Sequence, residues 1–104
     1  LIVMRTEFKV GLNAYLARQD SPGEVGSLKE LIEIHEKNRK LTMPFFGQEQ
    51  LISSEETDGL DNPIYKKALM TSRQLTREAG IDKSIFDHDL CALVMPTSPA
   101  PWGY

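Results

Sequence analysis

Apolar residues along most of this chain recur every three or four positions, the spacing that places them on one face of a helix. The clearest case opens the chain, where Met4, Phe8 and Leu12 share a face. The same spacing predicts five helices, at about residues 1–18, 28–38, 48–56, 63–79 and 83–88. Stretches rich in glycine, proline and polar residues separate several of them, as expected of connecting loops.

Residues that cap helices stand near the ends of these segments. Ser27 followed by Glu30 forms the pattern of a capping box, in which two side chains bond free amide groups of the first turn. Asn62 before Pro63 marks another start, because proline at the first helical position loses no useful hydrogen bond. We expect Gly80 to end that helix in a left-handed conformation.

The pattern changes at residues 91–96. The apolar run Cys91-Ala92-Leu93-Val94-Met95 continues without a polar residue until Pro96 stops it. Such a run is typical of a strand buried on both faces of a sheet. No second strand is predicted in the chain, so this strand needs a partner from outside the chain or from a second copy. The sequence therefore predicts an α/β fragment that is mostly helical, with one buried strand.

Both ends of the sequence are apolar. The chain opens on Leu1-Ile2-Val3-Met4 and stops on Pro101-Trp102-Gly103-Tyr104. Natural termini are usually polar unless they are docked. Together with the unpaired strand, this leads us to expect a piece of a larger α/β protein.

Composition and charge exclude several classes of protein. The 104 residues, 40% hydrophobic and 26% charged, fit one soluble globular domain at most. The net charge of −3 and the mixing of both signs indicate no nucleic-acid partner, and no apolar run is long enough for a membrane span. The single cysteine, Cys91, rules out a disulfide scaffold, is expected to be buried and fits a cytoplasmic location.

Two histidines are the first candidates for chemistry. His35 lies at the apolar edge of one predicted helix, and His88 lies at the end of another, where the helix dipole favours a cation. A functional interpretation makes His88 a base oriented by Asp87 or Asp89. The helix-end interpretation is favoured because no nucleophile is near His88 in the sequence. Neither histidine has the spacing of a metal ligand.

Two further clusters carry polar side chains. The carboxylates of Glu55, Glu56, Asp58 and Asp61 lack the alternating spacing of a calcium loop, so we expect a solvated surface loop. The pair Ser53-Ser54 lacks the glycines that expose a nucleophile at a tight turn. The residues therefore predict no metal site, no cofactor and no catalytic residue in this chain.

Three stretches are similar to amidase-signature enzymes, in an order and spacing that cover nearly the whole chain. Residues 6–16 resemble a helix from the later half of these enzymes. Met43-Pro44-Phe45-Phe46-Gly47-Gln48-Glu49 resembles the proline–aromatic–Phe-Gly-Gln loop that follows this helix in many bacterial members. Leu90-Cys91-Ala92-Leu93-Val94-Met95-Pro96-Thr97, preceded by Gly80-Ile81-Asp82, resembles the family's Leu-Asp-Ala-Leu-Val-x-Pro-Thr strand.

Amidase-signature enzymes hydrolyse the carbon–nitrogen bonds of amides, and their fold is a large mixed sheet with helices on both faces. The resemblance implies that residues 1–104 are a single fragment of such an amidase domain, whose sheet supplies partners for the predicted strand. The family works through a Ser–cis-Ser–Lys triad, with the lysine as base. This triad lies upstream of the similar region, so the resemblance assigns no catalytic residue to this chain.

The resemblance also places a substrate pocket near the end of the predicted strand. Ligands of open α/β sheets bind beyond the carboxyl ends of strands. Pro96, Thr97 and Ser98 are therefore expected to border the pocket, with Trp102 nearby. A structural role for Thr97 at the strand end is an equal alternative. This chain departs from many relatives in lacking a glycine soon after Pro96 and Thr97.

Two hypotheses about function follow. In the first, the chain is a non-catalytic part of an amidase, is inactive by itself and has the remainder of the amidase domain as its partner. The whole protein would then act on a small-molecule amide. In the second, the chain is an autonomous helical interaction module without enzymatic activity. Its strand edge and its aromatic tail, Trp102 and Tyr104, would then pair with a partner protein or a second copy.

Overall fold

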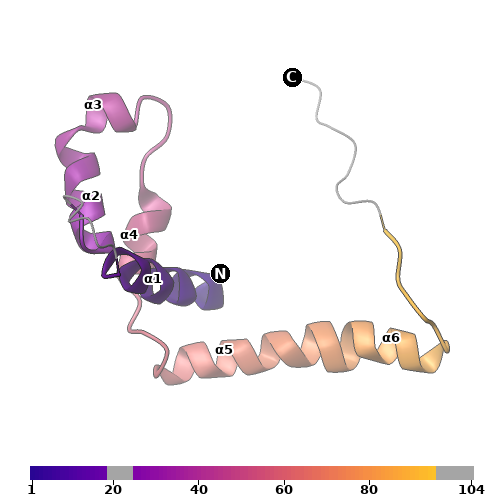
Figure 1. The fold of residues 1–104 in the computed structure, drawn as a ribbon. Coiled ribbons are helices and arrows are strands. Elements are labelled where there is room, and N and C mark those ends of the chain that lie inside the picture. Colours follow the sequence, from indigo (N-terminus) through magenta and orange to yellow (C-terminus); the bar gives the residue numbers. More distant parts are fainter. Residues whose placement is uncertain (19–24, 96–104) are drawn as a thin grey trace. The chain divides into compact units, whose positions relative to one another are not determined.

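The computed structural model describes residues 1–18 and 25–95, and every regular element in these ranges is a helix (Figure 1). The chain divides into two compact units, residues 1–69 and the residues from Met70 onward. The first unit holds α1 (Ile2–Leu16), α2 (Leu28–Lys37), α3 (Arg39–Thr42), α4 (Glu49–Glu55) and the start of α5 (Pro63–Arg73). The second holds the end of α5, the π-helical stretch η1 (Gln74–Ile81) and α6 (Asp82–Asp87). No helix within the described ranges has the length and apolar character needed to cross a membrane.

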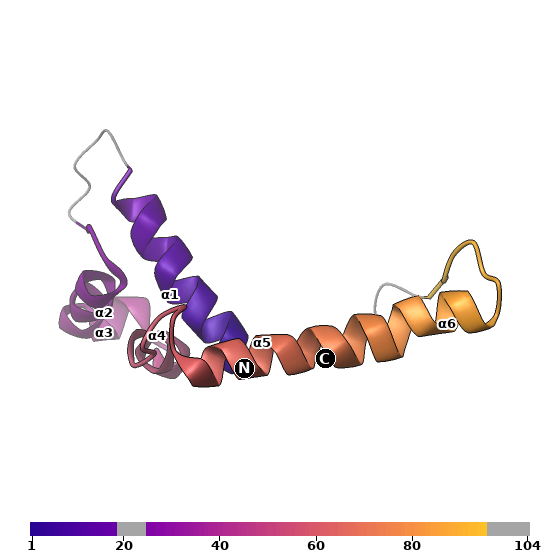
Figure 2. The ribbon, with the colours of Figure 1, turned by 90° about the horizontal axis from the view of Figure 1, so that it is seen from below.

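In the first unit α4 packs against both α1 and α2, and α1 also contacts α2 (Figures 1 and 2). The apolar core of this unit is small. Leu28 is fully buried, and Tyr65, at 8% exposure, is the other buried apolar side chain in the described residues. Much of the apolar surface of α1 and of the loops stays uncovered, so polar contacts between the helices contribute to holding the unit together.

Three side chains fix the start of α2. The Oγ of Ser27 accepts a hydrogen bond from the amide of Glu30 at 3.2 Å, which confirms the predicted cap. The carboxylate of Glu30 accepts from the amide of Gly26 at 2.6 Å, one residue earlier than in a standard capping box. Asn13 of α1 adds a bond between helices, because its Oδ1 accepts from the amide of Leu28 at 2.8 Å. Asparagine is a weak helix former, and here its side chain satisfies a free amide at the start of α2.

The end of α4 is held by Lys9 of α1. The ammonium group donates to the carbonyl oxygens of Glu55 at 2.5 Å and Thr57 at 3.0 Å, and it lies 3.4 Å from the Glu55 carboxylate. The hydroxyl of Thr57 donates to the carbonyl of Ser54 at 2.8 Å. The last carbonyls of a helix have no partner within it, and a positive charge is favoured there by the helix dipole. Lys9 therefore acts as a C-terminal cap supplied by another helix.

The start of α5 agrees with the sequence. The Oδ1 of Asn62 accepts a hydrogen bond from the amide of Ile64 at 2.7 Å, directly after Pro63 opens the helix. Two residues after the proline, the hydroxyl of Tyr65 donates to the carboxylate of Glu7 in α1 at 2.8 Å. Side chains of α1 therefore bond α2, α4 and the first turn of α5.

Gly80 interrupts the helix where the sequence predicts, but in a different conformation from the one expected. Its φ of −112° and ψ of −106° are neither left-handed nor helical, and they form a kink within η1, where two helical stretches meet. A Cβ at this position would lie 2.7 Å from the carbonyl oxygen of Leu75. The missing side chain thus allows a widened π-helical turn, in which residue 80 approaches residue 75. The left-handed conformation predicted for Gly80 is wrong, but the helix is interrupted at this residue, by a kink instead of a cap.

Replacing Gly80 by alanine is expected to remove this widened turn. The added Cβ meets backbone, which cannot move aside as a flexible side chain does, so the turn should revert to α-helical geometry. Residues after position 80 would then rotate by about 100° around the helix axis. NMR measurements across residues 74–82 should show the loss of contacts between residues five apart. Gly11→Ala is the matched control, since a Cβ there has nothing within 4 Å. An unchanged π-helical pattern in the Gly80 variant would contradict the steric explanation.

Residues 91–95 do not form the predicted buried strand. They lie outside any helix or strand, Cys91 is exposed, and Leu93 and Val94 are exposed as well. The physical reason is that the amide and carbonyl groups of a strand need a neighbouring strand, and none occurs in residues 1–18 and 25–95. The apolar run therefore remains without regular structure and uncovered up to Met95. Pro96, the predicted end of the strand, lies outside the described residues.

Candidate functional site

The residues that the amidase resemblance places at a substrate pocket are not among those that the structure describes. These are Pro96, Thr97, Ser98 and Trp102. Their role stays a prediction, and the site must be sought in residues 1–18 and 25–95.

The candidate base and the serine pair are not arranged for catalysis. His88 is exposed at the end of α6, and the carboxylate of Asp87 pairs with Lys83 instead of orienting the imidazole. Ser54 is buried, and its hydroxyl donates to the carbonyl of Gln50 at 2.7 Å. Within the described part of the chain, no serine hydroxyl bonds a histidine or a lysine side chain.

The carboxylates of residues 55–61 do not converge on one point. Asp58 accepts a hydrogen bond from the side-chain amide of Asn62 at 2.9 Å, and Asp61 forms an ion pair with Lys66 at 2.9 Å. Glu55 is the last residue of α4, and its carboxylate lies 3.4 Å from the ammonium group of Lys9. No group of three or more potential metal ligands occurs in the described residues. Asp58 and Asp61 are exposed, and the stretch has the geometry of a surface loop.

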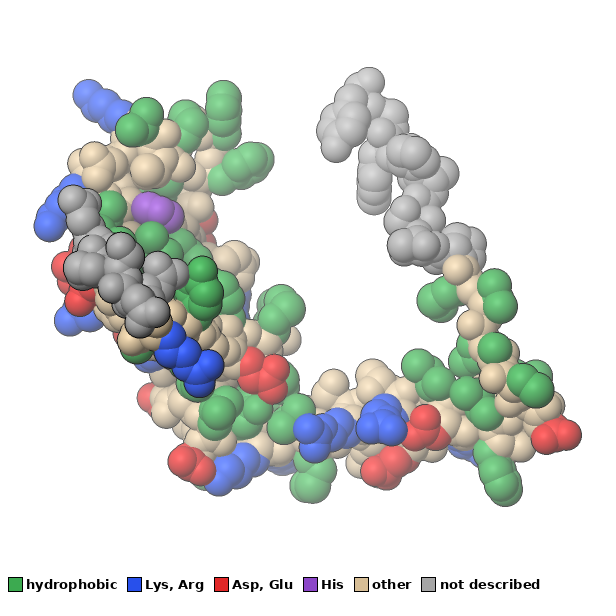
Figure 3. Space-filling model, viewed as in Figure 1, with side chains coloured by type: hydrophobic (Ala, Val, Ile, Leu, Met, Phe, Trp, Pro, Cys, Tyr) green, Lys and Arg blue, Asp and Glu red, His purple; other side chains and the backbone are tan. Residues whose placement is uncertain are grey.

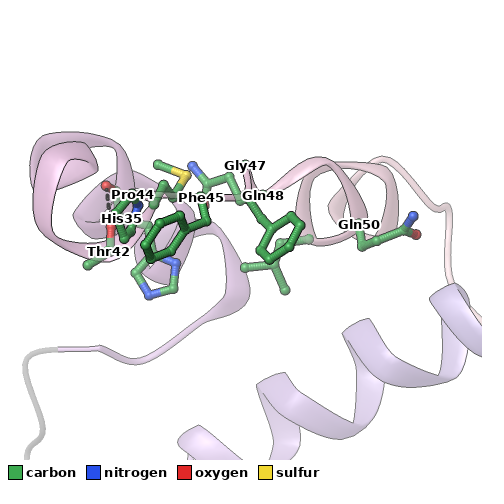
Figure 4. A pocket seen from close by; sticks show the side chains of 10 residues that line it. His35, Thr42, Pro44, Phe45, Gly47, Gln48 and Gln50 are labelled. Carbon is green, nitrogen blue, oxygen red and sulfur yellow. Dashed lines mark hydrogen bonds between the residues drawn. The ribbon is translucent and has the colours of Figure 1, made fainter. Parts of the chain in front are cut away.

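An apolar hollow of about 380 Å³ lies beside the loop that joins α3 to α4, and we call it the aromatic hollow. Figure 4 shows His35 of α2 and Phe45 of the loop on the same side of it. The rings of Phe45 and Phe46 are 88% and 86% exposed. The residues that line the aromatic hollow are His35, Thr42, Met43, Pro44, Phe45, Phe46, Gly47, Gln48, Gln50 and Leu51.

Polar side chains hold this loop at both of its ends. The Nε2 of Gln48 donates to the carbonyl of Ile32 at 3.1 Å and to the carboxylate of Glu36 at 3.3 Å, which ties the end of the loop to α2. At the other end, the hydroxyl of Thr42 donates to the carbonyl of His35 at 3.1 Å. The loop is therefore fixed to α2 while its two phenyl rings project into solvent.

The aromatic hollow is suited to packing and not to bond cleavage. His35 is the titratable side chain in its described lining, and no acidic side chain, serine or lysine accompanies it. Acyl transfer requires a nucleophile, a base and donors for the developing oxyanion within reach of one another. The described residues offer instead an apolar surface with a fixed backbone.

Three solved structures match this chain over most of its length. The first is a crystal structure of PAM12A, with a TM-score of 0.80. The other two are the native peptide amidase from Stenotrophomonas maltophilia and the peptide amidase PAM bound to the competitive inhibitor chymostatin, and both have a TM-score of 0.79. Each is 34% identical in sequence, and the match covers 86% of this chain. The chain matches part of an amidase-signature enzyme.

This match confirms the resemblance that the three sequence stretches indicated. The chain spans 18% of the length of each amidase chain that it matches. No protein-family model and no curated protein matches the chain. The described helices therefore correspond to part of the amidase fold, without a strand in residues 1–18 and 25–95.

Sequence reasoning missed the polar side chains that join these helices. Asn13 caps α2, Lys9 caps α4, and Gln48 ties the aromatic loop to α2. Asn13 left a signal, since asparagine within a helix is unfavourable unless its side chain has another use. Lys9 and Gln48 left none, because lysine and glutamine are ordinary residues at helix surfaces and helix starts.

Proposed function

We propose that this chain is a non-catalytic helical part of an amidase that hydrolyses carboxylic amide carbon–nitrogen bonds. Its Ser–cis-Ser–Lys triad would lie in other parts of that protein. The observation that carries this proposal is the match to peptide amidase, with 34% identity over 86% of the chain and a TM-score of about 0.8. A resemblance at this level covers helices in matching order, and is not limited to one motif.

The burial of apolar side chains supports a role within a larger domain. Only Leu28 and Tyr65 are buried among the apolar side chains of the described residues, whereas both phenyl rings of the aromatic loop are uncovered. Folded domains of this size usually bury far more of their apolar surface. The same reasoning suits residues 91–95, whose apolar side chains would be covered if a neighbouring strand completed the sheet.

The substrate pocket proposed here includes Pro96, Thr97, Ser98 and Trp102, by resemblance to the family. The substrate class is a small-molecule or peptide amide, and the location is the cytoplasm. In the described residues no histidine or lysine side chain forms a hydrogen bond with a serine hydroxyl that could act as a nucleophile. This supports a positioning or covering role for the segment.

The proposal predicts that the 104-residue chain releases no ammonia from a C-terminal peptide amide. A chimera of the Stenotrophomonas maltophilia peptide amidase, with this chain in place of the segment that it matches, should hydrolyse the same amide. Two variants of the chimera form a matched pair. Leu28→Asp should abolish its amide hydrolysis because Leu28 is fully buried, whereas Leu41→Asp should leave the hydrolysis nearly unchanged because Leu41 is 81% exposed. Turnover by the isolated chain, or a folded chimera without activity, would overturn the proposal.

A second candidate is an autonomous interaction module, which the exposed rings of Phe45 and Phe46 would also suit. Sedimentation of the isolated chain with candidate protein partners discriminates between the two. The module requires a stable folded complex in the absence of any amidase domain, whereas the amidase proposal expects none.

A further inference from the structure

A second apolar hollow adjoins the aromatic hollow on the first unit. It has a volume of about 450 Å³ and lies between α1 and α4. Its lining includes Leu1, Met4 and Phe8 of the α1 segment, and it shares Gln50 and Leu51 with the aromatic hollow. Because two lining residues are common to both, the hollows form one continuous surface. We call this surface the docking face, and its main apolar side chains are Leu1, Met4, Phe8, Phe45, Phe46 and Leu51.

Several apolar side chains of the docking face are mostly exposed. Besides the two phenyl rings of the loop, Met4 is 66% exposed. In Figure 3, hydrophobic side chains gather and protrude over the loop between α3 and α4. Contiguous apolar patches of this kind mark interaction surfaces, and aromatic side chains dominate the binding energy of such surfaces.

Two buried polar atoms in the same hollows lack a hydrogen-bond partner among the described residues. They are the Oε1 of Gln48, a side chain that is 8% exposed, and the Nε of Arg5. Gln48 lines the aromatic hollow and Arg5 lines the second one. Buried polar atoms are nearly always hydrogen-bonded in complete proteins. Both atoms are already enclosed by this chain, so an occupant of the surface could bond them only if the side chains of Gln48 and Arg5 turned outward on binding.

The length of the matched chains indicates which occupant fits. The match spans 18% of each solved amidase, so 82% of those chains has no counterpart in this structure. We propose that the docking face is the surface on which the remainder of an amidase domain packs, with an apolar layer against Phe45, Phe46 and Met4. The inference rests on the proposed function and adds the location of the contact.

Hydrogen exchange in the chimera and in the 104-residue chain tests this placement. If the docking face is covered in the chimera, amide exchange of residues 43–48 should be at least about tenfold slower there than in the isolated chain. The double substitution Phe45→Ser with Phe46→Ser should lower the melting temperature of the chimera by at least about 4 °C. Leu41→Ser is the control, because Leu41 is 81% exposed and lines neither hollow. It should change the melting temperature by less than about 1 °C.

The outcomes separate this inference from the proposed function. A folded, active chimera with unchanged exchange at residues 43–48, or with equal effects of the Phe45/Phe46 and Leu41 variants, overturns the docking face alone. A chimera that neither folds nor turns over amide counts against both. Sedimentation of the isolated chain tests whether a second copy occupies the docking face. A stable dimer that loses its association in the Phe45/Phe46 variant would show a second copy on this face, and would also overturn the inference.

Discussion

Leu28→Asp should abolish the cooperative unfolding transition of the first unit. Leu28 is fully buried where α2 begins, and it is the largest completely buried side chain among the described residues. A carboxylate at the first turn of a helix gains about 0.5 kcal/mol from the helix dipole. Burying that charge without a partner costs several kcal/mol, so the loss exceeds the gain. With only two buried apolar side chains in the described core, the unit has little stability to spare.

Urea unfolding followed by far-UV circular dichroism measures this effect, with Leu41→Asp as the matched control. Leu41 is of the same residue type but is exposed on α3, so its substitution should leave the urea midpoint nearly unchanged. Leu28→Ala provides a graded version that leaves no charge, and should cost about 2–5 kcal/mol. A midpoint for Leu28→Asp equal to that of the control would contradict the assignment of Leu28 to the core.

The helices were largely predictable from the sequence because their signals are local. Ser27 and Asn62 cap helices as their positions predict, and each bonds an amide only two or three residues away. The spacing of Met4, Phe8 and Leu12 likewise depends on a few turns of one helix. The amidase resemblance was predictable for a different reason, since it rests on three motifs in the correct order, and the solved structures confirm it.

The failures concern features that depend on residues distant in space. The apolar run at residues 91–95 satisfies the local pattern of a strand, but a strand also requires a neighbour with free backbone groups. Glycine is the residue type that most often caps the end of a helix, yet the conformation of Gly80 depends on the close approach of the Leu75 carbonyl. The hydrogen bonds of Asn13 and Lys9 join residues that are 15 and 46 positions apart, and no local pattern specifies their partners. The candidate pocket at Pro96, Thr97, Ser98 and Trp102 remains a prediction.

The second large effect is expected at the C-terminus of α4. Lys9→Met should lower the free energy of unfolding of the first unit by about 2 kcal/mol, because hydrogen bonds to charged groups contribute about 1.5–3 kcal/mol each and water replaces part of the loss. The substitution keeps an apolar side chain of similar length while removing the ammonium that serves the carbonyls of Glu55 and Thr57. The lysine side chain is 23% exposed, so it is shielded from most of the solvent. Urea unfolding, with the exposed Lys40→Met as control, measures the difference.

A double-mutant cycle with Glu55→Gln separates the two possible sources of this stability. The ion pair is only partly buried, and such pairs contribute about 0–1 kcal/mol. If the backbone carbonyls are the main partners of Lys9, then Glu55→Gln alone should lower the free energy of unfolding by much less than Lys9→Met does. Added salt should then change the destabilisation caused by Lys9→Met only a little. Equal losses for the two single variants, with a coupling energy that disappears in salt, would assign the stability to the ion pair instead. The expected inequality follows from geometry, since the Thr57 carbonyl lies at the 3.0 Å distance of a hydrogen bond and the Glu55 carbonyl lies closer still, whereas the carboxylate lies at 3.4 Å.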